Sequence, residues 1–368
     1  MLNLISRITV IAVGVGKYKD THLRRLEGPQ QDLDNLRELL TGNSSTALYP
    51  SNQFIEILNP SKEELSEALN GYIMSRSAEG DILIFYFSGH GVSIGRDDFG
   101  FCTVDTIIHP TTRVTLPLSV VKFSELLSSL YVANVVPVMI IDACYSGIAG
   151  KALEIPPIEA ISSMQHQLHS FAASSYALLC SCSDDEASID TTEGGVFSQY
   201  FVEVAAEGVE TSVVSSPILT LRNIYPKLNE KVLSSPDSTI PRLYLGPTLP
   251  DFPLIKNTQY KPRRYSLSHT FICVLEALWN DGQERVLSPS EIGALCSNGA
   301  YCNHNKLSFA PWDLVETIPN TRGIRRLTNR GRQFLQNRLQ VPKVIVEDPI
   351  SGIISPAEGT CYVRYMDF

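Results

Sequence analysis

Two apolar runs in the chain each end at a turn of small residues that carries one reactive side chain. Residues 82–87 and 138–141 are continuous apolar segments, which is typical of buried strands in a parallel sheet. His90 follows the first run in a glycine-flanked turn, and Cys144 follows the second. Because ligands bind at the carboxyl ends of strands in open α/β sheets, we expect these two side chains to meet at one sheet edge.

Hydrophobic periodicity predicts that strands and helices alternate through the first two thirds of the chain. It places the two runs above in strands at 82–88 and 135–141, and it predicts further strands at 7–14, 54–58, 176–182 and 241–245. It predicts helices at 32–40, 61–76, 124–131, 197–207 and 218–232, and a capping box from Ser61 to Glu64 opens the second of these. Repeated strand-helix-strand order predicts an α/β fold with a mainly parallel sheet and helices on both faces.

The pattern changes after a proline-rich stretch near residue 250. We predict a larger domain at 1–247, a linker at 248–264 and a smaller domain at 265–368. In the smaller domain we expect helices at 267–279, from the N-cap Ser288 onward and near Phe309, then a short strand and a capped helix within 323–339. This order resembles a winged helix-turn-helix, so we expect a small winged-helix-like domain.

Composition narrows the class of protein. The 368 residues carry a net charge of −9, which argues against a dedicated nucleic-acid binder. No segment reaches the roughly 18 apolar residues of a membrane span, and no small-residue cleavage site follows the apolar run at 8–15, so we expect a cytoplasmic location. Eight scattered cysteines are expected to be reduced.

Two groups of cysteines are candidate metal half-sites. Cys180 with Cys182, and Cys296 with Cys302 and His304, have suggestive spacings but no convincing partner pair. Buried thiols and a surface loop explain them better, so no metal site is predicted.

Cys144 and His90 are a candidate nucleophile and base. A thiol becomes a strong nucleophile when an imidazole takes its proton near neutral pH. The alternative is that both are ordinary packing residues, but each lies beyond its strand, where packing does not require it. Gly89 and Gly91 allow close approach of a peptide, and the amides of Gly91 and Cys144 are candidate oxyanion donors; simple turn geometry also explains these glycines.

Two motifs carry a resemblance to a known family. They are Tyr86-Phe87-Ser88-Gly89-His90-Gly91 and Asp142-Ala143-Cys144-Tyr145-Ser146-Gly147. The sequence resembles caspase-like cysteine peptidases, clan CD and C14-type, in particular the metacaspase and paracaspase branch, over residues 5–247. The resemblance implies a caspase-like fold and a thiol protease that uses a Cys-His dyad.

The same resemblance implies a primary specificity pocket formed by Asp32, Ser88 and Asp142. Carboxylates prefer a cation, and Arg forms the strongest bidentate pair, so we predict cleavage after Arg or Lys. Helix capping is an alternative role for Asp32, and orientation of the local loop is one for Asp142. True caspases have arginines in the primary specificity pocket and cleave after Asp. This chain has Leu26 where the first of those arginines would fall.

Calcium is not predicted to be obligatory. Asp105 matches one acid of the calcium-dependent metacaspases, but Val120, Val121 and Lys151 stand where further acids are expected. We therefore expect activity without any cofactor.

Many relatives are cut between the two parts of the catalytic domain or nearby. Candidate self-cleavage residues are Lys151 in the connector after Cys144 and, in the linker, Lys261, Arg263 and Arg264. Solvated loop charges are the equally weighted alternative.

The C-terminal domain has three candidate roles. It could bind DNA through a group of arginines, recruit a protein partner, upstream activator or substrate, or hold the protease inactive. The arginines are Arg322, Arg325, Arg326, Arg330, Arg332 and Arg338. Nearby acids offset them, so we favour protein interaction over DNA binding. A DNA- or protein-binding regulator with the caspase-like domain as a scaffold is the competing function. Microbial relatives often act in regulated cell death or defence, which is implied by the resemblance alone.

Overall fold

The computed structural model describes residues 5–42, 44–75, 80–94, 98–144, 175–181, 190–210, 216–235, 239–246, 252–280, 282–296 and 306–368. The chain divides into two compact units, Met1–Tyr260 and Lys261–Phe368. Each unit contains its own cluster of buried hydrophobic side chains. Among the helices in the described residues, none is long and apolar enough to cross a bilayer.

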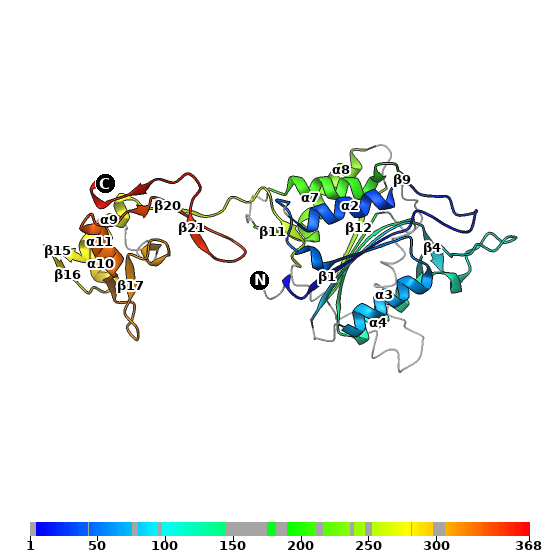
Figure 1. Cartoon of the computed structure of the whole chain (residues 1–368), viewed down its shortest axis with the longest axis horizontal. Helices are drawn as coiled ribbons and strands as arrows, with labels where there is room; N and C mark the ends of the chain where they lie inside the picture. Colours follow the sequence, from blue (N-terminus) through cyan, green and yellow to red (C-terminus); the bar gives the residue numbers. More distant parts are fainter. Residues whose placement is uncertain are drawn as a thin grey trace. The chain divides into compact units, whose positions relative to one another are not determined.

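A six-stranded sheet forms the centre of the first unit, with the strand order β12-β8-β7-β3-β1-β2 (Figure 1). Its strands are β1 (Ile8–Gly14), β2 (Phe54–Leu58), β3 (Ile82–Ser88), β7 (Val136–Asp142), β8 (Ala177–Cys180) and β12 (Arg242–Leu245). Neighbouring strands run parallel, except that β12 is antiparallel to β8. The predicted mainly parallel α/β sheet is confirmed.

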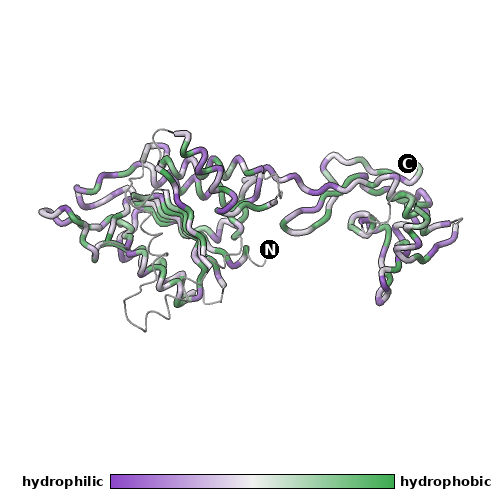
Figure 2. The backbone as a smooth tube through the Cα atoms, turned by 180° about the vertical axis from the view of Figure 1, so that it is seen from behind, coloured by the Kyte–Doolittle hydropathy of each residue, from purple (hydrophilic) through white to green (hydrophobic). Residues whose placement is uncertain are grey.

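Helices cover both faces of this sheet (Figure 1). On one face lie α2 (Pro29–Leu40), α7 (Val196–Glu207) and α8 (Leu221–Leu233), and on the other α3 (Lys62–Ser75) and α4 (Phe123–Val132). Every residue of β1 and β3 is buried, and Figure 2 shows the hydrophobic segments of this unit gathered in the sheet strands. Burial of both faces of β3 explains why residues 82–87 are continuously apolar and do not alternate between apolar and polar positions.

Local start signals place several helices where the sequence predicts them. The Glu64 side chain accepts a hydrogen bond of 2.7 Å from the Ser61 amide, and the Glu64 amide donates to the Ser61 hydroxyl at 3.2 Å. This reciprocal capping box opens α3.

The helix predicted at 218–232 is wrong at its start, because Ile218–Leu219 form β11 and the helix α8 (Leu221–Leu233) begins only after the N-cap Thr220.

Two smaller antiparallel elements follow the central strands. A three-stranded sheet contains β4 (Gly91–Ile94), β5 (Asp98–Phe101) and β6 (Val121–Lys122), and it begins directly after His90. A short hairpin of β9 (Asp190–Thr191) and β10 (Gly194–Gly195) leads into α7.

Part of the stretch predicted as a linker packs into the first unit. Residues Ile255–Lys256 form β13, which pairs with β11, and the Leu254 amide donates to the Leu219 carbonyl at 2.9 Å. Phe252, Leu254 and Ile255 are buried. Their apolar side chains therefore complete the first unit's interior, although prolines surround them in the sequence.

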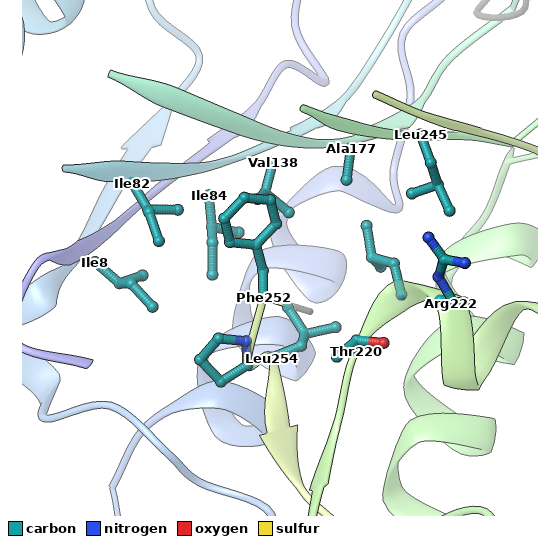
Figure 3. Close-up of a pocket in the computed structure, with 12 residues that line it drawn as sticks. Ile8, Ile82, Ile84, Val138, Ala177, Thr220, Arg222, Leu245, Phe252 and Leu254 are labelled. Atoms are coloured by element: carbon teal, nitrogen blue, oxygen red, sulfur yellow. The ribbon is translucent and has the colours of Figure 1, made fainter. Parts of the chain in front are cut away.

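A small apolar cavity lies beneath this segment (Figure 3). Phe252 and Leu254 line it together with the sheet residues Ile8, Ile82 and Val138. Ile8 and Ile82 are the first residues of their strands. The cavity is therefore far along the sheet from the carboxyl ends of β1 and β3.

In the described residues of the second unit, the α-helices are α9 (His269–Ala277), α10 (Pro289–Leu295) and α11 (Asn329–Leu335). Its larger sheet has the order β14-β20-β21. The strands of that sheet are β14 (Arg264–Ser266), β20 (Val344–Glu347) and β21 (Ile354–Pro356). The paired short strands are β15 (Trp279–Asn280) with β16 (Gln283–Glu284), β17 (Val315–Thr317) with β18 (Arg325–Leu327), and β19 (Val341–Pro342) with β22 (Tyr362–Val363).

Two predictions for the second unit have different outcomes. The Ser288 cap is confirmed, since its hydroxyl accepts from the Glu291 amide at the start of α10. In the described residues no α-helix starts near Phe309, contrary to the prediction, and a single 3-10 turn at 306–308 comes just before it. Phe309 lies in a turn before Trp312, which is fully buried and donates from Nε1 to the Pro342 carbonyl at 2.6 Å. The resemblance of this unit to a winged helix stays a prediction.

Candidate active site

The carboxyl ends of β3 and β7 lie side by side. The two strands are parallel, and Ser88 at the end of β3 is in register with Asp142 at the end of β7. The Gly89 amide then donates to the Asp142 carbonyl at 3.2 Å, so the backbones remain paired beyond the strands. His90 and Cys144 each follow two residues after a member of this registered pair.

The His90 imidazole contacts the loop after β1. Its Nε2 lies 2.7 Å from the carbonyl oxygen of Arg24. A carbonyl oxygen only accepts, so Nε2 carries the proton and, in the neutral ring, Nδ1 is the acceptor. This tautomer leaves Nδ1 as the atom that can take a proton.

The backbone at Gly91 approaches Cys144 closely. A Cβ atom added to Gly91 would lie 2.5 Å from the Cys144 carbonyl oxygen and 2.4 Å from the Phe99 ring. Real Cβ atoms do not approach so near, so this position requires glycine. The half-exposed Cys144 therefore lies beside the backbone that immediately follows His90.

A second cysteine lies in the same region but has a different environment. The Cys102 amide donates to the His90 carbonyl at 3.0 Å, and its side chain is fully buried. Burial raises the pKa of the Cys102 thiol to about 12. A thiol that stays protonated is a poor nucleophile, so Cys102 is a packing residue and the half-exposed Cys144 is the candidate nucleophile.

Asp32 comes from the first turn of α2 and is buried, with 1% of its surface exposed. The Ser88 hydroxyl donates to its Oδ2 at 2.6 Å, and the Gly195 amide donates to its Oδ1 at 3.0 Å. Two of the predicted pocket residues, Asp32 and Ser88, are therefore in direct contact.

Asp142 is buried at the end of β7 and contacts α7. The Ser198 hydroxyl donates to its Oδ2 at 2.6 Å, and the Tyr86 hydroxyl lies 2.6 Å from the same Ser198 oxygen. Burial, and after it the charges of Asp32 and Asp142, raises the pKa of Tyr86 well above its ordinary value. Tyr86 therefore stays protonated and donates to Ser198, which donates to Asp142.

The two carboxylates share one neighbourhood at Gly195. A Cβ atom added there would lie 2.2 Å from Asp142 Oδ2 and 3.5 Å from Asp32 Oδ2. The structure thus brings together the three predicted pocket residues at the strand ends that carry His90 and Cys144. It also adds contacts of Tyr86, Ser198 and Gly195 with these carboxylates and with one another, which the sequence alone does not show.

Metal-type side chains do not cluster in the described residues: no group of three or more His, Cys, Asp or Glu there could hold an ion. Asp105 has a structural role, since its Oδ1 accepts from the Lys62 amide at 2.9 Å and from the Thr103 hydroxyl at 2.8 Å. These contacts tie the loop after β5 to the start of α3.

The candidate self-cleavage residues lie in different places. Lys151 falls outside the described residues. Lys261, Arg263 and Arg264 are exposed, and Arg264 begins β14 of the second unit.

Comparison with known proteins gives one family match. The sequence profile described as the caspase domain matches residues 7–252. Similar solved structures include a protein from Geobacter sulfurreducens, with 17% identity and TM-score 0.41 over 66% of this chain and 94% of that one. Caspase-1 from Spodoptera frugiperda shares 16% identity, with TM-score 0.42 over 66% and 89% of the two chains. No curated protein matches the chain.

Proposed function

Because the chain belongs to the caspase domain family, whose members are cysteine peptidases, we propose that it is an endopeptidase that cleaves proteins after Arg or Lys. In this proposal Cys144 is the nucleophile and His90 is the base. The observation that supports it most is the register of Ser88 with Asp142, because the two reactive residues follow that pair at equal spacing on adjacent strands.

The tautomer of His90 suits the base role. With Nε2 bound to the Arg24 carbonyl, Nδ1 takes the proton from the Cys144 thiol as sulfur attacks the scissile carbonyl carbon. The amides of Gly91 and Cys144 donate to the oxyanion that forms. His90 then returns the proton to the leaving amine, and water hydrolyses the remaining thioester.

Specificity for a basic residue follows from the buried carboxylates. Asp32 and Asp142 lie near one another at Gly195, and hydroxyl and amide donors hold their orientation. A guanidinium or ammonium group that enters beside them gains charge-assisted hydrogen bonds in a place where water is scarce. An Asp side chain would meet like charge there, so cleavage after Asp is disfavoured.

A panel of fluorogenic peptides that differ only in the residue before the scissile bond tests this function. We expect turnover after Arg and Lys by the full chain and none by Cys144→Ala. Turnover restricted to peptides with Asp at that position would overturn the specificity, and equal turnover by Cys144→Ala would overturn the nucleophile. Calcium is not required in this proposal, so a chelator should leave the rate unchanged.

Self-processing belongs to the same proposal. Lys261, Arg263 and Arg264 are exposed basic residues after the last buried segment of the first unit. Cleavage there would release the second unit without removing Phe252 or Leu254 from the first unit's interior. A Cys144→Ala protein that gave the same fragments as the wild type would contradict self-processing at these sites or at Lys151.

The second unit is proposed to bind a protein partner. Several arginines of its basic group are engaged internally: Arg326 pairs with Glu316 at 2.7 Å and Arg332 with Glu284 at 2.9 Å. Arg330 donates to the carbonyls of Pro311 and Trp312. Such contacts reduce the charge available to phosphates, so DNA binding is disfavoured. Salt-dependent DNA binding by the full chain, lost when Arg322 and Arg338 are changed to Ala, would reverse this preference.

A further inference from the structure

We infer that Tyr18 is a positioning residue that holds the His90 imidazole in its reactive orientation. The inference rests on the proposed function, because it assigns a role to Tyr18 through the base of that reaction. Tyr18 lies in the loop after β1, 72 residues before His90, and it is half-buried.

The Tyr18 hydroxyl is fixed from both sides. It donates to the Val15 carbonyl at 2.7 Å and accepts from the His90 amide at 2.9 Å. One hydroxyl thus links the end of β1 to the turn after β3. Since a phenolic oxygen has one proton to donate, the Val15 contact orients its lone pairs toward the His90 amide.

The Tyr18 ring also contacts the imidazole directly. The ring centroids are 4.9 Å apart with an interplanar angle of 43°. This distance is within the range of favourable aromatic pairs. The imidazole therefore has an aromatic neighbour against its ring and the Arg24 carbonyl at its Nε2 edge. Together the two contacts restrict the side-chain torsions that decide where Nδ1 points.

The loop that carries Tyr18 is anchored on both sides of that residue. Asn59 Oδ1 accepts from the amides of Gly16 and Lys17 at 2.9 and 3.0 Å, and the Lys19 amide donates to the Val104 carbonyl at 2.8 Å. Asn59 itself has φ of 50°, a conformation that Asn tolerates better than most residues. Tyr18 is therefore held in place independently of His90, which is what a positioning contact requires.

The chain offers a matched control in Tyr49. Its hydroxyl also donates to a backbone carbonyl, that of Pro253, and its side chain is buried. Tyr49→Phe removes the same kind of hydrogen bond from the same unit, without touching His90 or Cys144. Tyr18→Phe keeps the ring and removes the hydroxyl, whereas Tyr18→Leu removes both.

The test measures alkylation of Cys144 by iodoacetamide in the full chain, with the modified peptide identified by mass spectrometry. This separates Cys144 from the exposed Cys361. Near neutral pH, we expect Tyr18→Phe to react about tenfold more slowly than the wild type and Tyr18→Leu about a hundredfold. At about pH 10 all variants should converge, because the thiol ionises there without help from an imidazole. In peptide cleavage, kcat should fall while KM stays constant.

The possible outcomes separate the inference from the function on which it rests. Tyr49→Phe should lower the melting temperature but match the wild type in alkylation rate at both pH values. His90→Ala lacks the base, so we expect it to react more slowly than the wild type near neutral pH. If it does and Tyr18→Phe reacts like the wild type, only the positioning role is wrong. If His90→Ala itself reacts like the wild type, the proposed dyad is wrong and the role of Tyr18 falls with it.

Discussion

The Ser198 hydroxyl donates to Asp142 Oδ2 at 2.6 Å and so ties α7 to the end of β7, across 56 residues of sequence. The same hydroxyl oxygen lies 2.6 Å from the Tyr86 hydroxyl on β3. The carboxylate beside the candidate nucleophile is therefore oriented by a relay of two hydroxyls. All three side chains are buried, and a hydrogen bond is electrostatically stronger in the protein interior than in water.

Replacement of Ser198 by Ala should destabilise the protein and leave two buried polar groups without this partner. We expect a loss of about 1–3 kcal/mol in the free energy of unfolding, measured by urea denaturation. Tyr86→Phe should cost less in the Ser198→Ala background than in the wild type, since its hydroxyl has already lost its acceptor. Additive costs in this double-mutant cycle would show that the relay is not coupled.

Replacement of Asp32 by Asn should reduce cleavage after Arg or Lys. The variant keeps the shape of the side chain and loses its charge, so kcat/KM should fall about 10- to 100-fold. Asp34→Asn is the matched control, because Asp34 is an exposed residue of the same helix. Alkylation of Cys144 should be unchanged in both variants. An equal loss of kcat/KM in Asp34→Asn would point to general electrostatics instead of a specificity pocket.

Replacement of Gly91 by Ala should abolish activity, because the new methyl group would collide with the Cys144 carbonyl and the Phe99 ring. The matched control is Gly71→Ala within α3, where a Cβ atom meets nothing within 4 Å. That change should raise stability by about 0.5–1 kcal/mol, since Ala is the better helix former. Peptide turnover measures the loss of activity expected in Gly91→Ala, and thermal melting measures the gain of stability expected in Gly71→Ala. Full activity in Gly91→Ala would show that the loop has room to move.

Stability should fall steeply in alkaline solution. Burial raises the pKa of Cys102 from an ordinary value of 9.0 to about 12, and it raises the pKa of Tyr86 and Tyr49 above 10.0. Above pH 9.0 the unfolded chain releases the Cys102 proton while the folded chain keeps it, so the unfolded state gains stability as the pH rises.

The slope identifies the group responsible. Between pH 9.0 and about 12, one such group costs at most about 1.4 kcal/mol per pH unit. Cys102→Ala should make the dependence of unfolding free energy on pH shallower in that window, whereas Cys361→Ala, which changes an exposed thiol, should leave it unaltered. Identical slopes in both variants would contradict the burial of Cys102.

The elements whose signal is local could be predicted from the sequence. The runs at 82–87 and 138–141 are apolar because both faces of their strands are buried, and Ser61 with Glu64 opens α3 through contacts three residues apart. The expectation that His90 and Cys144 follow two strands of one sheet also needs only the chain order, since β3 and β7 are parallel neighbours.

Contacts between distant segments were decided by the tertiary structure. Ile218 and Leu219 read as the start of a helix, but they pair with Ile255–Lys256, which a proline-rich composition marks as linker. A helix is predicted to start near Phe309, but the chain bends there after one 3-10 turn, and Trp312 just beyond is fully buried. In each case the gain from burying apolar surface outweighs a local propensity that is worth much less.

In the candidate site, too, some features follow from the sequence and others from contacts between distant segments. The residue types of the nucleophile, the base and the pocket carboxylates are determined by the sequence, since their chemistry is carried by the side chains themselves. The tautomer of His90, the relay from Tyr86 through Ser198 and the place of Tyr18 depend on which atoms meet. These hydrogen bonds join residues that are 56 to 112 positions apart in the sequence. Only the folding of the chain around the sheet brings such residues within hydrogen-bond distance.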